Sequence, residues 1–518
     1  MLKSSGAMAA ATMTSRVLGM VREMVYARFM GTSWVASAFL LAFQIPNLFR
    51  RLLGEGALTA AFIPIFKEKE KLEGGQAMWR AANAVISALI VFTCVVVVIG
   101  FVAVSIALAA GQNHFSEKTL LMLQLLRWML PYLLLVCLAA VFMGMLNARG
   151  RFFIPAMGAT MLNVVMIASV LWLAPKMGAQ LDEQIFALAI GVLAAGVAQA
   201  AFQLPTLWRD GFSFRWVSPW RDETVRRVVK QMLPATIGVG AFQINVVLTQ
   251  GLAYWVDDYI VASFQYAVRL MELPQGLFGV SLATYLLPAL SGLAAEKNYD
   301  AFRGELRQGL SYLIFANLIA SVLLVVLAEP IIRLLFERGK FDAVSTQQAA
   351  LALACLAPGL VAFSAVNVLA RAFFALGDTK TPMKVSAFCL LLNLILAVSL
   401  VWRFKQAGLG IANTATSLMN VWLLTFMLRK KLVKLEMESL RNSLFPLALA
   451  TALAGVVAWF GWRFWENSLG HATLALKLGA VFVPAGLAGI VYWLTTLVLK
   501  IPAAKEIGDL ILSRFRSS

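Results

Sequence analysis

The sequence predicts an all-α, polytopic membrane protein with about 14 transmembrane helices, arranged as two six-helix lobes and two extra C-terminal helices. The 518 residues are 61% hydrophobic and only 14% charged, whereas soluble domains carry about 25% charged residues. Most of the chain consists of apolar runs of about 20 residues, the length that crosses a bilayer as a helix. A pattern of prolines and glycines also recurs in the second half of the chain.

We expect the first span to be retained in the protein and not removed as a signal peptide. It begins like a signal peptide, with Lys3 before small residues, but Arg16 and Arg22 interrupt its apolar core. The spans that follow are mostly apolar runs joined by short polar connections. The expected helices are 6–30, 33–63, 81–109, 119–146, 153–174, 184–208, 228–252, 258–290, 305–328, 345–375, 382–402, 408–428, 443–465 and 472–499.

An internal repeat groups these helices. Pro131, Gly150 and Pro155 recur 227 positions later, as Pro358, Gly377 and Pro382, and Pro64 recurs 224 positions later, as Pro288. An offset of six helices is an even number, so the two halves would be parallel repeats with a site between them. The alternative is that these residues simply mark turns. The predicted divisions are an N-terminal lobe (1–210, helices 1–6), a C-terminal lobe (226–435, helices 7–12), lateral helices 13 and 14 (443–500) and a cytoplasmic tail (501–518).

The loops predict the orientation in the membrane. Alternate loops carry 22 lysines and arginines in one set and 9 in the other. The richer set lies on the cytoplasmic side by the positive-inside rule, so both termini are expected there. These loops account for the formal net charge of +18. Their basic residues are scattered and do not form a folded basic domain, so no nucleic-acid partner is expected.

Four arginines lie deep in the expected spans: Arg16, Arg22, Arg50 and Arg269. An arginine in hydrocarbon costs about 2.5 kcal/mol or more, so several of them predict a shared, water-filled, cationic cavity suited to an anion. Arg28, Arg51 and Glu55 are closer to span ends, where snorkelling to the interface is the simpler interpretation.

Other polar residues accompany these arginines. Glu272 follows Arg269 by one helical turn, so the two can form an ion pair. Asn47 follows Pro46, and Pro274 follows Glu272, so the backbone is expected to loosen beside both charges, as happens in membranes where it lines protein or water. Gln44 is a further polar group near Asn47. A structural ion pair and packing kinks are the alternative interpretations.

The cysteines and histidines give little support for a metal site or for histidine-based catalysis. The four cysteines lie far apart in apolar runs, and the two histidines, His114 and His471, leave little scope for a zinc site. We expect no enzyme activity, no metal and no cofactor.

Four local motifs stand out in order along the chain. They are Ser15-Arg16-Val17-Leu18-Gly19 with Arg22, Pro46-Asn47-Leu48-Phe49-Arg50-Arg51 with Glu55-Gly56-Ala57, Arg269-Leu270-Met271-Glu272 with Pro274, and Phe336-Glu337-Arg338-Gly339-Lys340-Phe341. Together they resemble the MurJ (MviN) lipid II flippase family of the multidrug/oligosaccharidyl-lipid/polysaccharide exporter superfamily. The resemblance implies 14 helices in two lobes, a lateral helix pair whose groove receives a lipid tail, and cavity roles for Arg16, Arg22, Arg50, Arg269 and Glu272.

The sequence departs from the family pattern at three positions. Ser37, Gln44 and Val268 stand where many members carry charged residues, so the cavity would hold fewer charges than the family pattern.

The expected function is transfer of lipid II from the inner to the outer leaflet of the cytoplasmic membrane by alternating access. The substrate-binding residues would be Arg16, Arg22, Arg50, Arg269, Glu272, Asn47 and Gln44, with lipid II and membrane lipids as partners of a monomer. The alternatives are another exporter-superfamily transporter, such as an O-antigen flippase or a drug or cation antiporter, and a membrane glycosyltransferase.

Overall fold

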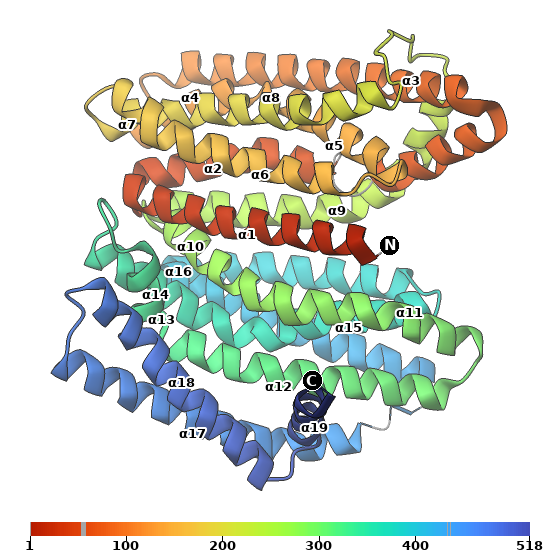
Figure 1. The fold of residues 1–518 in the computed structure, drawn as a ribbon. Coiled ribbons are helices and arrows are strands. Elements are labelled where there is room, and N and C mark those ends of the chain that lie inside the picture. The colour runs from red at the N-terminus through yellow and green to blue at the C-terminus, as the bar shows by residue number, and fades with distance from the viewer. Residues whose placement is uncertain (1, 53–57, 433, 436, 518) are drawn as a thin grey trace. The chain divides into compact units, whose positions relative to one another are not determined.

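The computed structural model describes residues 2–52, 58–432, 434, 435 and 437–517, and for 2–12, 59, 60, 234–239, 241, 242 and 510–517 it describes the backbone only. The secondary structure of these residues is helical, without strands (Figure 1). Two compact units divide the chain, Met1–Ala262 and Ser263–Ser518. The all-α prediction is confirmed.

The described residues of the first unit form nine α-helices. They run roughly alongside one another in Figure 1, apart from the short α7. Their bounds are α1 (Leu2–Met30), α2 (Trp34–Phe49), α3 (Leu58–Gly111), α4 (Glu117–Met129), α5 (Tyr132–Ala148), α6 (Phe153–Ala168), α7 (Leu181–Gln184), α8 (Phe186–Arg209) and α9 (Glu223–Val256). α9 contacts α2 and α3 and so belongs to this unit, while the lobe limits at 210 and 226 stay a prediction.

The second unit follows through α10 (Ile260–Pro274), which carries the chain across the division. Its other helices are α11 (Ser281–Ala295), α12 (Tyr299–Val326), α13 (Ala328–Phe336), α14 (Ala343–Leu356), α15 (Leu360–Ala375), α16 (Lys380–Leu432), α17 (Glu438–Ser468), α18 (Leu474–Val498) and α19 (Pro502–Ser517). The expected lateral helices are α17 and α18, which contact each other and α12. In Figure 1, α19 is seen nearly end-on, so it runs across the direction of its neighbours α12 and α18.

The long helices contain breaks that separate expected spans. Within the described chain, nine helices are long and apolar enough to cross a membrane, or ten if α4 and α5, bent by 44°, count as one span. α16 holds the expected spans 382–402 and 408–428 on either side of Lys405, which has a φ of 51°. α3 breaks in the same way at Gly74, with a φ of 85°. The count of 14 spans stays a prediction.

The helix that begins at Leu58 extends beyond residue 63, where the span was expected to end. It continues through charged residues up to the break at Gly74. Lys67 pairs with Glu70 at 2.9 Å, and Lys69 pairs with Glu73. Pairs at these spacings stabilise a helix outside hydrocarbon, and hydropathy alone does not detect such an extension.

The repeat is visible in backbone hydrogen bonds. After α5, the Gly150 N–H donates to the Asn147 carbonyl at 3.0 Å and the Arg151 N–H to that of Leu146 at 2.9 Å. After α15, Gly377 donates to Phe374 at 3.0 Å and Asp378 to Phe373 at 2.9 Å. Each donor and acceptor after α15 lies 227 positions after its counterpart at the end of α5.

Both glycines have a positive φ, 76° and 71°, which is the left-handed conformation of a helix C-terminal turn. Pro131 and Pro358 also take equivalent places, at the breaks between α4 and α5 and between α14 and α15. The two copies therefore share local structure as well as sequence punctuation.

Each of these turns also fastens the loop to a later helix of the same unit, with the charges reversed. Arg151 pairs with Asp210, just past α8, at 3.0 Å. Asp378, its counterpart, pairs with Lys431 near the end of α16 at 2.8 Å. The hydrogen bond from Lys431, followed by that from the Thr381 N–H, holds the pKa of Asp378 well below its usual value. An ion pair therefore occurs after both helices, but the turn supplies the base in the first unit and the acid in the second.

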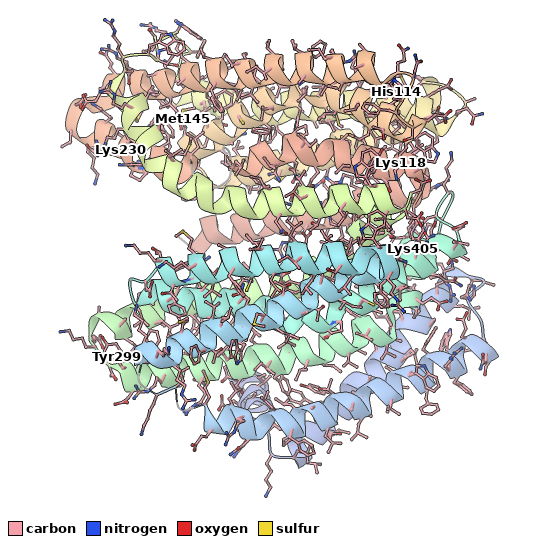
Figure 2. The ribbon with its side chains drawn as sticks, turned by 180° about the vertical axis from the view of Figure 1, so that it is seen from behind. His114, Lys118, Met145, Lys230, Tyr299 and Lys405 are labelled. Carbon is pink, nitrogen blue, oxygen red and sulfur yellow. The ribbon has the colours of Figure 1, made fainter. Side chains whose placement is uncertain are left out.

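The two sets of loops lie at opposite ends within each unit. Figure 2 shows His114 and Lys118 at one end of the first unit and Met145 and Lys230 at the other. Tyr299 and Lys405 likewise lie at opposite ends of the second unit. This separation agrees with the alternation that the loop charges predict.

Candidate functional site

Arg16 and Arg22 lie in the middle part of α1. The side chain of Arg16 is exposed, whereas that of Arg22 is 12% exposed. Arg22 Nη2 donates to Glu23 Oε1 at 2.5 Å, and its guanidinium lies 5.4 Å from the centre of the Tyr26 ring. A buried carboxylate and an aromatic face both lower the cost of burying this cation. Glu23, which follows Arg22 directly in sequence, is thus its ion-pair partner.

Arg50 lies where α2 loosens. The helix contains Pro46, and residues 50–52 form a π-helical turn. The Arg50 side chain is partly buried, and its Nε donates to Asn47 Oδ1 at 2.8 Å. Gln44, one turn earlier, is also partly buried. The expected disturbance of the backbone is confirmed, and it lies beside the charge.

Arg269 lies near the end of α10 in the second unit. Its Nη1 donates to Glu272 Oε2 at 2.9 Å, the ion pair expected from their spacing. The Glu272 side chain is 47% exposed and that of Arg269 is 32% exposed. Pro274 follows, and residues Gln275–Val280 form a π-helical segment.

Both halves combine a proline, a π-helical turn and an arginine that hydrogen-bonds an acceptor three residues away, Asn47 in one half and Glu272 in the other. The order differs, because Arg50 begins its turn after the proline, whereas Arg269 precedes both the proline and the turn. π-helical turns concentrate at functional sites because they distort the helix locally. Sequence analysis located the prolines but not the type of turn.

Two of the arginines lie within the first unit on helices that pack with α5 or its neighbours. Arg22 is on α1 and Arg50 follows α2, which contacts α5, and Tyr132 at the start of α5 is 1% exposed. Tyr132 was not among the expected site residues, because a tyrosine in an apolar run is ordinary in sequence. Arg16 is exposed on α1, and Arg269 and Glu272 belong to the second unit, so the meeting of all four arginines stays a prediction. Glu55 lies outside the described residues.

Ser37, at which the sequence departs from the expected charge pattern, contacts the chain just past α9. Its hydroxyl donates to the Asp258 carbonyl at 2.5 Å. Lys118 Nζ donates to the Tyr254 carbonyl at 2.5 Å and pairs with Asp258 Oδ1 at 2.9 Å. The C-terminus of α9 is thus fastened to α2 and α4 by polar contacts that join residues far apart in sequence.

Two solved structures have a similar fold. The chain is similar to a multidrug resistance MATE family transporter of the MOP superfamily in an inward-facing conformation, with a TM-score of 0.66, 15% identity and coverage of 83% of this chain and 98% of the other. It is also similar to the lipid II flippase MurJ in an inward closed conformation, with a TM-score of 0.75, 22% identity and coverage of 95% and 98%. The chain therefore belongs to the class of fold that these two proteins share.

Within this class, the chain belongs to the lipid II flippase MurJ family, whose model matches residues 26–479. A lipid II flippase MurJ from Burkholderia cenocepacia is 33% identical over 461 residues, covering 88% of this chain and 89% of the relative. A probable lipid II flippase MurJ from Vibrio cholerae is 30% identical, covering 90% and 92%. The resemblance found in the local motifs is confirmed. The protein is thus a multi-pass inner-membrane protein of a transporter family.

Proposed function

We propose that this protein moves lipid II from the inner to the outer leaflet of the cytoplasmic membrane. The observation that carries the proposal is membership of the MurJ family, supported by relatives at 30–33% identity over about nine-tenths of both chains. The arginines at mid-helix support it independently, because a diphosphate is an anion and the membrane interior otherwise excludes such charges.

Arginines suit this substrate better than lysines would. A guanidinium presents paired donors to phosphate oxygens. In our proposal Arg16, Arg22, Arg50 and Arg269 hold the diphosphate, while Asn47 and Gln44 face sugar or peptide. Glu272 holds Arg269 at 2.9 Å until phosphate competes for the guanidinium.

Transport follows an alternating-access cycle. The headgroup enters sideways from the inner leaflet, the two lobes rock so that the cavity opens outward, and the polyprenyl tail stays in hydrocarbon throughout. A membrane potential acts on a cationic cavity with about 2.3 kcal/mol per charge per 100 mV, which favours the return of the empty, inward-facing state. Both termini lie in the cytoplasm, and the monomer is the transporting unit.

Complementation tests the proposal. Cells depleted of their own lipid II flippase should grow when they express this protein and should lyse when they express Arg16→Ala or Arg269→Ala. Arg28→Ala is the matched control, because Arg28 is exposed on the same α1 as Arg16 and lies near the end of the helix. Failure of the well-expressed unsubstituted chain would contradict the function, and growth with both alanine variants would contradict the arginine assignment.

A drug or cation antiporter is the second candidate, because a multidrug transporter shares the fold at a TM-score of 0.66. Purified protein in vesicles separates the two. A lipid II flippase makes lipid II added to one leaflet accessible from the other, without needing a drug or ion gradient as co-substrate. Gradient-driven drug efflux without lipid II translocation would favour the antiporter.

A further inference from the structure

The connection between α8 and α9 is an extended segment with exposed aromatic side chains. Residues 211–222 follow α8 as an irregular loop, visible in Figure 1 beside α3. The exposed fractions are 48% for Phe214, 58% for Trp216 and 78% for Trp220. Three large exposed aromatics within seven residues are unusual for a loop in water.

This segment is held firmly against α3. Gly211, with a φ of 93°, turns the chain back after α8. Phe212 then packs against Trp79 and Phe142, with ring centres 5.5 and 6.2 Å apart. The Asn83 side-chain amide donates to the Ser213 carbonyl at 2.9 Å. The exposed aromatics thus project from a fixed backbone.

A second anchor fixes the level of the segment along α3. The Val217 N–H donates to the Ser87 hydroxyl at 3.2 Å. Asn83 and Ser87 are one helical turn apart, so the segment runs along α3 from one to the other.

The surface of α3 shows where hydrocarbon begins. Residues 81–87 are buried on every side of the helix, whereas large apolar side chains from Phe92 to Ile106 are exposed. From residue 91 to the end of α3 there are about 20 residues, or about 30 Å, which matches the hydrocarbon thickness of a bilayer. The inner boundary of the hydrocarbon therefore lies near residue 90.

Ser87 is three residues, or about 5 Å, outside this boundary. The headgroup layer is about 5 to 7 Å thick on each side of the hydrocarbon, so Val217, which is bonded to Ser87, lies within it. Ser213, which is bonded to Asn83, lies about 10 Å from the boundary, at the aqueous edge of that layer. Tryptophan and other amphipathic aromatic residues are enriched at this depth in membrane proteins.

The charges of the segment suit an anionic surface. The acids at its two ends are already engaged within the protein, since Asp210, just before the segment, pairs with Arg151, and Asp222 accepts from the Val225 N–H at the start of α9. Arg215 and Arg221 are exposed, and no ion pair of either is found among the described residues.

We propose that residues 211–222 form an interfacial anchor, in which Phe214, Trp216 and Trp220 insert at the headgroup level of the inner leaflet while Arg215 and Arg221 bind the phosphates of anionic phospholipids. The connection between the two predicted lobes is then tied to α3 on one side and to the bilayer on the other. This proposal concerns lipid contact and does not depend on which substrate is moved.

Depth-dependent quenching tests the anchor. Single cysteines at Phe214 or Trp220, in full-length protein whose four native cysteines are replaced, carry an environment-sensitive fluorophore in phosphatidylcholine vesicles with or without phosphatidylglycerol. Phe92→Cys is the hydrocarbon control and Leu72→Cys the aqueous control, since these side chains are 51% and 75% exposed. We expect nitroxides near the headgroup to quench the probes at 214 and 220 more strongly than nitroxides deep in the acyl chain.

The proposed binding of anionic lipid by Arg215 and Arg221 is measured separately. With the probe at 214, quenching by nitroxide-labelled phosphatidylglycerol should exceed quenching by labelled phosphatidylcholine. Arg215→Gln and Arg221→Gln should each reduce this preference about fivefold, which corresponds to about 1 kcal/mol per basic residue at the surface. Lys176→Gln, on an exposed lysine between α6 and α7, should leave it unchanged.

Two results would overturn the proposal. If the probes at 214 and 220 are quenched no more than the probe at 72, or as deeply as the probe at 92, the segment is not an interfacial anchor. If the unsubstituted protein shows no preference for phosphatidylglycerol, the arginines do not bind anionic lipid. Neither result bears on the growth of complemented cells, so a failed anchor and a failed flippase remain distinguishable.

Discussion

At the residue scale, the site is built from charges that already have partners. Arg22 contacts Glu23 and Tyr26, Arg50 contacts Asn47, and Arg269 contacts Glu272. Such partners lower the cost of placing cations in a membrane, and each one also competes with an incoming phosphate. The proposed binding of a diphosphate is therefore an exchange of acceptors around fixed guanidinium groups.

The pair of Arg22 and Glu23 should be asymmetric when it is broken. The Glu23 side chain is 5% exposed, so Arg22→Ala removes the Arg22 ion pair from a buried carboxylate, and this costs about 3 kcal/mol or more. Glu23→Gln removes the charge but keeps a polar group of the same size. We expect Arg22→Ala to lower the midpoint of thermal unfolding in detergent much more than Glu23→Gln.

The double variant Arg22→Ala/Glu23→Gln serves as the control for this comparison, because it also removes the buried carboxylate charge of Glu23. It should recover most of the loss in thermal stability. Equal losses in both single variants, without recovery in the double variant, would show that the pair contributes little to stability.

At the element scale, the turns after α5 and α15 should respond alike to substitution. Gly150 and Gly377 have φ values of 76° and 71°, where an L-residue costs about 1 to 2 kcal/mol. We expect Gly150→Ala and Gly377→Ala to lower stability by similar amounts. Gly251→Ala in α9, where no atom lies within 4 Å of the added carbon, should be neutral or stabilising. Thermal unfolding of the three variants checks this, and a neutral Gly150→Ala would contradict the strained turn.

The loop before α16 adds a pH-dependent contribution. Asp378 accepts from the Thr381 N–H at 3.0 Å and from Lys431 at 2.8 Å. Because these contacts lower the pKa of Asp378, its stabilisation is present above the ordinary value of about 3.9 and is lost as the pH falls through the lowered pKa. Asp378→Asn should be less stable than the unsubstituted protein at pH 7, and the difference should shrink below about pH 4.

Asp182→Asn is the matched control for that experiment, since Asp182 is exposed on the short α7. It should unfold like the unsubstituted protein at both pH values. If the difference between Asp378→Asn and the unsubstituted protein persisted unchanged well below pH 4, the carboxylate would not be its source.

The sequence predicted elements better than contacts. Apolar length located the helices, and the offset of 227 residues located turns with matching hydrogen bonds, because both depend on short stretches of chain. The π-helical turns after Pro46 and Pro274 and the attachment of Ser37 to Asp258 were missed. These features depend on which helices become neighbours, and hydropathy carries no such information.

At the scale of the whole molecule, the repeat constrains the topology. Parallel repeats place corresponding ends of the two lobes on the same side of the membrane, and the loop charges assign the richer set to the cytoplasm. A topology with both termini in the cytoplasm then places His114 outside and Lys230 and Tyr299 inside. His114 and Lys230 do lie at opposite ends of the first unit (Figure 2).

Cysteine accessibility in intact cells tests this arrangement. In a chain whose four native cysteines are replaced, an impermeant maleimide should label His114→Cys in whole cells with a permeable outer membrane. Lys230→Cys and Tyr299→Cys should react only after the inner membrane is opened. Because Lys230 and Tyr299 belong to different units, the same response from both is required by parallel repeats, whereas labelling of one from each side would rule out that symmetry. Reversal of all three would keep the repeat but overturn the orientation inferred from the loop charges.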